Sequence, residues 1–177
     1  IPELDPAHYG FTEADLAQTF ATGSFAAAPE QATLREILES LRQTYCGTIG
    51  AEFMHCTDPT EKRWWQERLE SIRSKPSFTA DEKKHILDRL TAAEGLERYL
   101  HTKYVGQKRF SLEGGESLIP LMDEVIHRAG TDGIKEIVIG MAHRGRLNVL
   151  VNTLGKPPHQ LFAEFEGKHE GPTDPAH

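Results

Sequence analysis

A histidine and two arginines stand together in the stretch His143-Arg144-Gly145-Arg146, where a run of β-branched residues meets a helical pattern. Both arginines carry permanent charges, and the planar guanidinium group suits bidentate binding of a phosphate or a carboxylate. His143 can donate, accept or transfer a proton near neutral pH. Gly145 has no side chain, so a ligand can approach the backbone there. These residue types predict a site that binds an anion beside a proton-transfer step.

The elements on either side of this stretch predict how it is positioned. Residues 108–113 and 135–140 have the pattern of short strands, and the second is a continuous apolar run typical of a strand buried on both faces. Residues 116–130 and 145–155 have apolar side chains at helical spacing. The order strand, helix, strand, helix predicts an α/β fold with a doubly wound parallel sheet and right-handed crossovers.

The predicted strand ends bring the candidate residues together. In open parallel sheets, ligands bind beyond the carboxyl ends of the strands. His143 and Arg144 would follow the second strand, whereas Phe110 and Glu113 would lie near the end of the first. A purely structural interpretation stays open from spacing alone, because the arginines could pair with Glu113 or Glu116 and the histidine could be half-buried.

The preceding part of the chain, residues 1–105, is predicted to be mostly helical. Four helix starts follow from capping patterns, in which one side chain accepts a free N–H group and an acidic residue three positions later reaches back. These starts are Thr33, Asp58, Thr79 and Thr91. Trp64 and Trp65 fall within the second helix, where we expect them to serve packing. We therefore predict two regions, with the α/β domain beginning at residue 106 and continuing to residue 177.

Composition limits the classes of function. The 177 residues are 38% hydrophobic and 27% charged, which predicts a globular chain, and the net charge of −7 argues against non-specific nucleic-acid binding. No apolar run approaches the roughly 20 residues of a membrane helix, and no signal peptide is visible. The histidines lack zinc-ligand spacing. Because the chain lacks an initiator Met, we expect it to be a piece of a longer protein.

Long motifs in both regions resemble one enzyme family. The segments KRFSLEGGESLIPLMDEVI and IVIGMAHRGRLNVLVNTLGK closely resemble the thiamine-diphosphate-dependent decarboxylating (first) component of the 2-oxoglutarate dehydrogenase complex. The segment LRQTYCGTIGAEFMHCTDPTEKRWWQERLES resembles the helical region before its catalytic core, and HYGFTEADLAQTF fits the same family further upstream. The resemblance covers nearly the whole chain. It implies an incomplete thiamine-diphosphate-binding fold, in which residues 106–177 begin the diphosphate-side domain.

The resemblance implies roles for three residues. His143 matches the histidine of the family's HRGRLNV motif, which lines the active centre near the reacting carbon of thiamine and the 2-oxo acid. Arg144 matches the arginine that contacts the cofactor diphosphate, and Phe110 matches the phenylalanine of RFSLEG that borders the substrate. The residues expected around these three are Arg109, Glu113 and Arg146.

The reaction implied by the resemblance is decarboxylation of 2-oxoglutarate with thiamine diphosphate and Mg²⁺, followed by transfer of the succinyl group to a lipoyl group in the citric acid cycle. The implied partners are a second copy of the chain in a homodimer, the lipoyl-bearing succinyltransferase component and dihydrolipoyl dehydrogenase. Neither nucleic acid nor a membrane is implied as a partner. The implied location is the bacterial cytoplasm, or the mitochondrial matrix in a eukaryote.

Several parts of the family's active centre have no match in this sequence. No GDG or GDA motif is present to hold magnesium, so no metal ligand is assigned within the chain. The glutamate that activates the thiamine ring and a further substrate-binding histidine lie downstream in the family, and the docking arm is absent or cut at Ile1. We therefore expect the chain alone to be inactive. Two alternatives stay open: a relative specific for 2-oxoadipate, and a non-catalytic helical interaction module.

Overall fold

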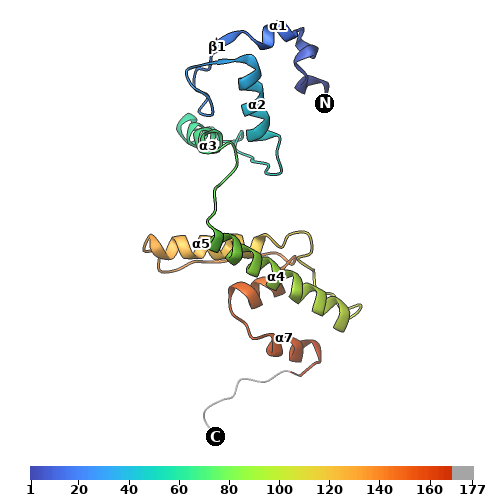
Figure 1. Ribbon diagram of the computed structural model, residues 1–177. Coiled ribbons are helices and arrows are strands. Elements are labelled where there is room, and N and C mark those ends of the chain that lie inside the picture. Colours follow the sequence, from blue (N-terminus) through green and yellow to red (C-terminus); the bar gives the residue numbers. More distant parts are fainter. Residues whose placement is uncertain (169–177) are drawn as a thin grey trace. The chain divides into compact units, whose positions relative to one another are not determined.

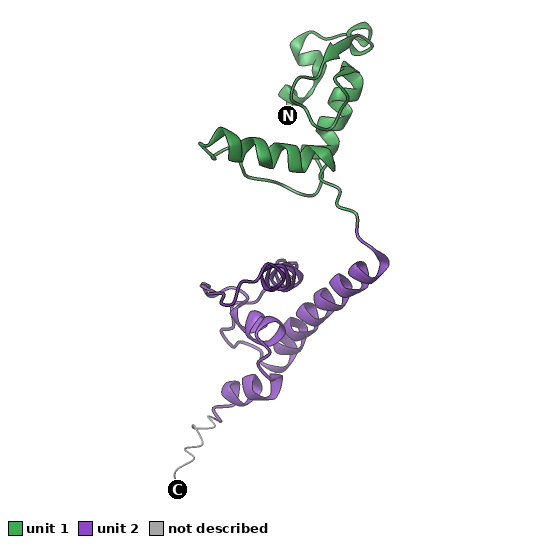
Figure 2. Cartoon of the chain, turned by 90° about the vertical axis from the view of Figure 1, so that its left-hand side faces the viewer, with its two compact units in different colours: residues 1–77 green, residues 78–177 purple. Residues whose placement is uncertain are grey.

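The computed structural model describes residues 1–168 and consists mainly of helices. The chain divides into two compact units, residues 1–77 and the residues from Phe78 onward (Figure 1, Figure 2). Residues 78–105, which sequence analysis assigned to the helical region, therefore lie in the same compact unit as the segment that follows. The boundary at residues 105 and 106 stays a prediction for the domains of a longer protein.

The first unit contains a two-stranded antiparallel sheet followed by two packed helices. In chain order its elements are η1 (Pro2–Leu4), η2 (Pro6–Tyr9), α1 (Glu13–Leu16), β1 (Thr19–Ala21), β2 (Gln31–Thr33), α2 (Leu34–Tyr45) and α3 (Pro59–Ser71). In the sheet, Phe20 lies opposite Ala32. Helix α2 begins directly after β2 and contacts α3 (Figure 1).

Two of the predicted helix starts lie in this first unit, at the beginnings of α2 and α3. The Thr33 hydroxyl accepts a hydrogen bond from the Glu36 N–H, while the Glu36 carboxylate accepts one from the Thr33 N–H at 2.8 Å. Asp58 caps α3 through the N–H two residues later, and these two starts are confirmed. Trp64 and Trp65 contact each other edge to face but are 55% and 40% exposed in this chain, so their packing role stays a prediction for the longer protein.

The second unit is organised around one long helix. Its elements are α4 (Ala80–Lys103), α5 (Leu118–Thr131), α6 (Arg146–Asn148), the π-helical turn η3 (Val149–Thr153) and α7 (Pro158–Phe165). Helix α4 contacts α5, α6 and η3. The buried core consists of Ala93, Leu112, Ile119 and Val149, with Leu118 and Met141 packed against it. Ring contacts such as Tyr99 with Phe162, 4.8 Å apart at their centroids, hold α7 on the end of α4.

Helix α4 confirms one predicted start and corrects another. Thr79 and Glu82 form the expected reciprocal cap at its beginning. Thr91, however, begins no helix, because α4 continues through it. The Thr91 hydroxyl instead donates to the Leu87 carbonyl, 2.8 Å away, one turn earlier. A threonine can make this bond inside a helix, so its capping pattern was misleading here.

The predicted doubly wound parallel sheet is not formed by residues 1–168, in which β1 and β2 are the only strands. Residues 108–113 and 135–140 belong to neither a helix nor a strand. The second segment was expected to be buried on both faces, yet Val138 is 97% exposed. A parallel strand needs a neighbouring strand for its hydrogen bonds and helices over its faces. The described residues place no strand beside either segment, which explains the difference.

Candidate functional site

The turn that carries His143 and Arg144 depends on a glycine. Gly145 has φ of +74°, a conformation that side chains with a Cβ atom disfavour, and it precedes α6. Its N–H donates to the Phe110 carbonyl at 2.8 Å. A Cβ atom at this position would lie 2.5 Å from Cδ1 of the buried Leu112. A residue with a Cβ atom at this position would therefore require the buried Leu112 side chain to shift.

The structure brings Phe110 and His143 together, as sequence analysis predicted. Their rings are stacked, with centroids 4.8 Å apart and an angle of 26° between the planes. Both side chains are exposed. Phe110 has a left-handed φ of 48°, which is unusual for a residue with a side chain and carries a conformational cost of about 1 kcal/mol or more. The contacts of the neighbouring residues must therefore hold this segment in place.

The two arginines of the turn bind main-chain carbonyls. Arg144 donates to the carbonyl of Glu113, which links the turn to the segment after Phe110. Arg146 donates to the Ala142 carbonyl at 3.0 Å, and its guanidinium lies 3.5 Å from Nδ1 of His143. In residues 1–168 neither arginine forms an ion pair with an acidic side chain. The pairs with Glu113 or Glu116 that the structural interpretation suggested are therefore not formed, but the bonds to main-chain carbonyls are themselves structural, so the ligand-binding role of this turn stays a prediction.

The buried centre of the site is Glu97 on α4, which sequence analysis did not identify. Its carboxylate forms an ion pair with Arg109 and accepts hydrogen bonds from the Ser111 hydroxyl at 2.8 Å and the Leu112 N–H at 3.0 Å. It also accepts a bond from the Asn148 side-chain amide at 3.1 Å. Only 8% of the Glu97 side chain is exposed. One carboxylate thus binds both the segment around Phe110 and the helix after His143.

A signal for Glu97 is present in the sequence. It lies four residues after Ala93 and three before Leu100, and both of these residues are buried on α4. An acidic residue within an apolar stripe of a helix is unusual unless it has partners that satisfy its charge. Those partners lie 12 to 51 residues further along the chain, so the sequence pattern alone does not name them.

The environment of Glu97 keeps its carboxyl group charged. Burial raises the pKa of Glu97, but the hydrogen bonds from the Leu112 N–H, Ser111 and Asn148, together with the charge of Arg109, lower it more. The resulting pKa of Glu97 lies below its ordinary value. A carboxylate is an acceptor only, and four donors match that chemistry.

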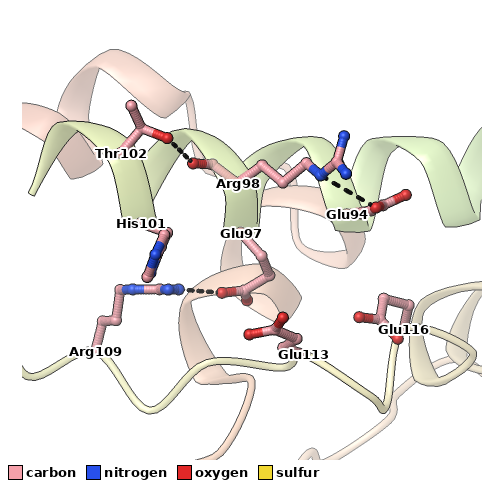
Figure 3. Close-up of a pocket in the computed structure, with 8 residues that line it drawn as sticks. All are labelled: Glu94, Glu97, Arg98, His101, Thr102, Arg109, Glu113 and Glu116. Atoms are coloured by element: carbon pink, nitrogen blue, oxygen red, sulfur yellow. Dashed lines mark hydrogen bonds and ion pairs between the residues drawn. The ribbon is translucent and has the colours of Figure 1, made fainter. Parts of the chain in front are cut away.

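A pocket of about 550 Å³ opens beside the Glu97–Arg109 pair (Figure 3). Its lining is mostly charged, consisting of Glu94, Glu97, Arg98, His101, Thr102, Arg109, Glu113 and Glu116. Two of the residues expected around the site, Arg109 and Glu113, line this pocket. Phe110, His143 and Arg144 do not line it. The predicted site residues are therefore adjacent to the pocket rather than inside it.

The described residues contain neither a candidate metal cluster nor a candidate membrane helix. Within residues 1–168 no group of three or more His, Cys, Asp or Glu side chains is arranged to hold a metal ion. In the same residues no helix combines the length and apolar character needed to cross a bilayer.

Comparison with known proteins gives strong similarity over nearly the whole chain. The chain is 70% identical over 169 residues to the 2-oxoglutarate dehydrogenase E1 component of Cupriavidus necator, which is 96% of this chain and 18% of that protein. It is 60% identical over 167 residues to the protein of the same name from Azotobacter vinelandii, covering 94% of the chain and 18% of that relative. The corresponding Haemophilus influenzae protein is 52% identical over 169 residues. No family model matches the chain.

These identities extend across both units, so the chain is a homologue of part of a dehydrogenase component. The chain is similar to one part of the 2-oxoglutarate dehydrogenase E1 components, and this confirms the resemblance seen in the sequence motifs. The chain spans only 18% of the length of these relatives. It therefore corresponds to one segment of such a protein, and a complete catalytic centre is not expected within it.

Proposed function

We propose that this chain is a segment of a thiamine-diphosphate-dependent 2-oxoglutarate dehydrogenase that transfers a succinyl group to a lipoyl group. The observation that carries the proposal is the 70% identity, over 96% of the chain, to a 2-oxoglutarate dehydrogenase E1 component. The fold proposed for the longer protein is the thiamine-diphosphate-binding fold, in which residues 108–113 and 135–140 pair with strands from other parts of the polypeptide. The exposed apolar side chain of Val138 supports this part of the proposal.

His143 and Phe110 form the proposed substrate-facing part of the site. A 2-oxo acid carries a carboxylate and a carbonyl oxygen that gains negative charge during the reaction. The imidazole of His143 is exposed and can donate a hydrogen bond to either oxygen. The ring of Phe110 covers one face of that imidazole and restricts its orientation. We assign His143 the role of positioned proton donor and Phe110 the role of an apolar border beside the substrate.

Arg144 is the proposed contact to the cofactor. Thiamine diphosphate, when bound, supplies the carbanion chemistry that releases carbon dioxide from a 2-oxo acid. The donor set fits its diphosphate end, because the exposed guanidinium of Arg144 has N–H groups beyond the one bonded to the Glu113 carbonyl. We assign the Mg²⁺ ligands to other segments of the longer protein. The 177-residue chain is then expected to bind magnesium–thiamine diphosphate weakly and to lack decarboxylase activity.

The proposed partners follow from the proposed reaction. A succinyl acceptor must carry a lipoyl group, which we assign to the succinyltransferase component of a multienzyme complex. Dihydrolipoyl dehydrogenase would then reoxidise that group, and the E1 polypeptide would act as a homodimer. The curated relatives named above are bacterial proteins, which favours a cytoplasmic location within this proposal.

The role of His143 is tested by His143→Ala in a full-length E1 polypeptide that contains this sequence. Loss of a positioned proton donor lowers kcat/KM for 2-oxoglutarate by about 10²- to 10⁴-fold. The affinity for thiamine diphosphate should change far less, because Arg144 and magnesium hold the diphosphate. Steady-state kinetics and a separate cofactor titration on the same folded variant give both values. Near-normal turnover would contradict the catalytic role of His143.

The role of Arg144 is tested by Arg144→Ala in the same polypeptide. A charge-assisted contact is worth about 1.5–3 kcal/mol, so the cofactor Kd should rise by about 10- to 150-fold. Arg146→Ala is the comparison variant for cofactor affinity, since it removes an equal charge two residues away that bonds the Ala142 carbonyl and lies beside the His143 ring. Equal losses of cofactor affinity in the two variants would show that Arg144 has a structural role.

A further inference from the structure

We propose that Glu97 is a positioning residue that holds Phe110 and His143 against each other from beneath the site. This inference rests on the proposed roles of Phe110 and His143, and it adds a residue to which neither the sequence motifs nor the relatives' names assign a function. Glu97 touches neither ring. Its effect passes through the residues on either side of them, which it binds directly.

Glu97 binds the residues on both sides of Phe110. Arg109 and Ser111 flank Phe110, and both donate to Oε2 of Glu97. The N–H of Leu112 donates to Oε1 at 3.0 Å. Three anchors, at positions 109, 111 and 112, thus lie on either side of a phenylalanine whose own backbone has a left-handed φ of 48°. The carboxylate offsets the cost of that conformation.

Glu97 also binds the helix that follows His143. Asn148 is completely buried, and its side-chain amide donates to Glu97 Oε1 at 3.1 Å and to the Ala93 carbonyl at 2.9 Å. Asn152 donates to the Asn148 side-chain oxygen at 2.7 Å, which fixes the orientation of that amide. Helix α6 is therefore held to α4 through both Glu97 and the Ala93 carbonyl. His143 lies at the turn that leads into this helix.

Glutamine cannot replace this carboxylate, although it has the same shape. The two oxygens of Glu97 accept from four donors, and glutamine offers one oxygen and one NH₂ group. In either orientation its NH₂ group would face at least one group that can only donate. If the NH₂ group takes the place of Oε2, it faces the permanently charged guanidinium of Arg109, whose side chain is only 11% exposed. If the NH₂ group takes the place of Oε1, it faces the N–H of Leu112 and the side-chain NH₂ of Asn148.

The test uses Glu97→Gln, with Glu94→Gln as the matched control. Glu94 lies on the same helix, makes an ion pair with Arg98 at 3.2 Å and binds none of the site segments. In the 177-residue chain, NMR of the His143 ring reports the stack, because an aromatic ring shifts the signals of protons above its face. Phe110→Ala supplies the reference signals for the unstacked ring. In a full-length E1 polypeptide, kcat/KM for 2-oxoglutarate is measured for the same variants.

We expect Glu97→Gln to move the His143 signals toward those of Phe110→Ala and to lower kcat/KM by about 10- to 100-fold, as small displacements of catalytic groups do. Glu94→Gln should leave both at wild-type values. A folded Glu97→Gln protein with wild-type His143 signals would overturn the proposal. If that variant does not fold, Arg109→Met combined with Ser111→Ala retains the bonds to Oε1, and unchanged His143 signals there would overturn it equally.

The two proposals fail in different ways. If His143→Ala leaves kcat/KM unchanged while Glu97→Gln moves the His143 signals, the positioning is supported and the catalytic role of His143 is wrong. If His143→Ala lowers kcat/KM and Glu97→Gln changes neither signal nor rate, the catalytic role stands and the role of Glu97 is wrong.

Discussion

Replacing Gly145 by alanine should destabilise the second unit by an amount that can be divided into two parts. The first is the left-handed conformation, φ +74°, which costs a residue with a Cβ atom about 1–2 kcal/mol. The second is the contact of the new Cβ atom with Leu112, whose Cδ1 would lie 2.5 Å away and whose Cβ and Cγ would lie 3.3 Å away. Leu112 is packed in the core, so relieving this contact should cost about 1–3 kcal/mol. The expected total is about 2–5 kcal/mol in the free energy of unfolding.

Two other glycines of the same unit separate these contributions. Gly155 has the same φ of +74° but no atom within 4 Å of an added Cβ, so Gly155→Ala should show the conformational cost alone. Gly95 lies inside α4 with ordinary helical geometry and open space, so Gly95→Ala should stabilise the protein by about 0.5–1 kcal/mol. Equal losses for Gly145→Ala and Gly155→Ala would refute the close contact with Leu112.

The assay is urea unfolding of the 177-residue chain, followed by two signals. Both tryptophans, Trp64 and Trp65, lie in the first unit, so their fluorescence reports only that unit. Far-ultraviolet circular dichroism reports the helices of both units. A Gly145→Ala effect should appear in the dichroism and leave the tryptophan transition unchanged, which makes the first unit an internal control.

Two further predictions concern buried carboxylates. Glu70 is 1% exposed and accepts hydrogen bonds from the Ala26 N–H and the Tyr45 hydroxyl, so Glu70→Ala should destabilise the first unit by about 1–3 kcal/mol. Glu67→Ala on the same helix should cost far less, because Glu67 is exposed. Tryptophan fluorescence during urea unfolding measures the stability of both variants. The folded pKa of Glu97 is depressed, so its contribution to stability is present above the ordinary value of 4.5 and is lost as the pH falls through the lower folded pKa. Dichroism-monitored unfolding in acid should therefore show a smaller loss for Glu97→Gln than for the wild type, and equal slopes would contradict this.

Local chemistry explains which elements could be predicted from sequence. The caps at Thr33, Asp58 and Thr79 involve groups two or three residues apart, so the sequence contains both partners of each bond. The helix start predicted at Thr91 failed because the same side chain can bond within a continuous helix. The predicted strand at residues 135–140 depends on partners far away in the chain, and the described residues do not supply them.

The site shows the same division between near and distant contacts. The proximity of Phe110 and His143 was predicted from strand ends, and it is present although the strands are not. The buried role of Glu97 was not predicted, since its partners Arg109 and Asn148 are 12 and 51 residues away. A single acidic residue in an apolar stripe is a visible signal, but only the three-dimensional arrangement shows what satisfies it.

The exposed segment Ile134–Gly140 has a practical consequence for work with this chain in isolation. Its sequence is rich in β-branched residues, contains no proline, and has opposite charges that cancel at Lys135 and Glu136. Segments with these properties and free backbone groups pair readily with identical copies and form cross-β aggregates. Ile134, Ile137 and Val138 all present their side chains to solvent. We therefore expect concentration-dependent self-association of the isolated chain to begin at this segment, and charged substitutions at Val138 to improve its solubility.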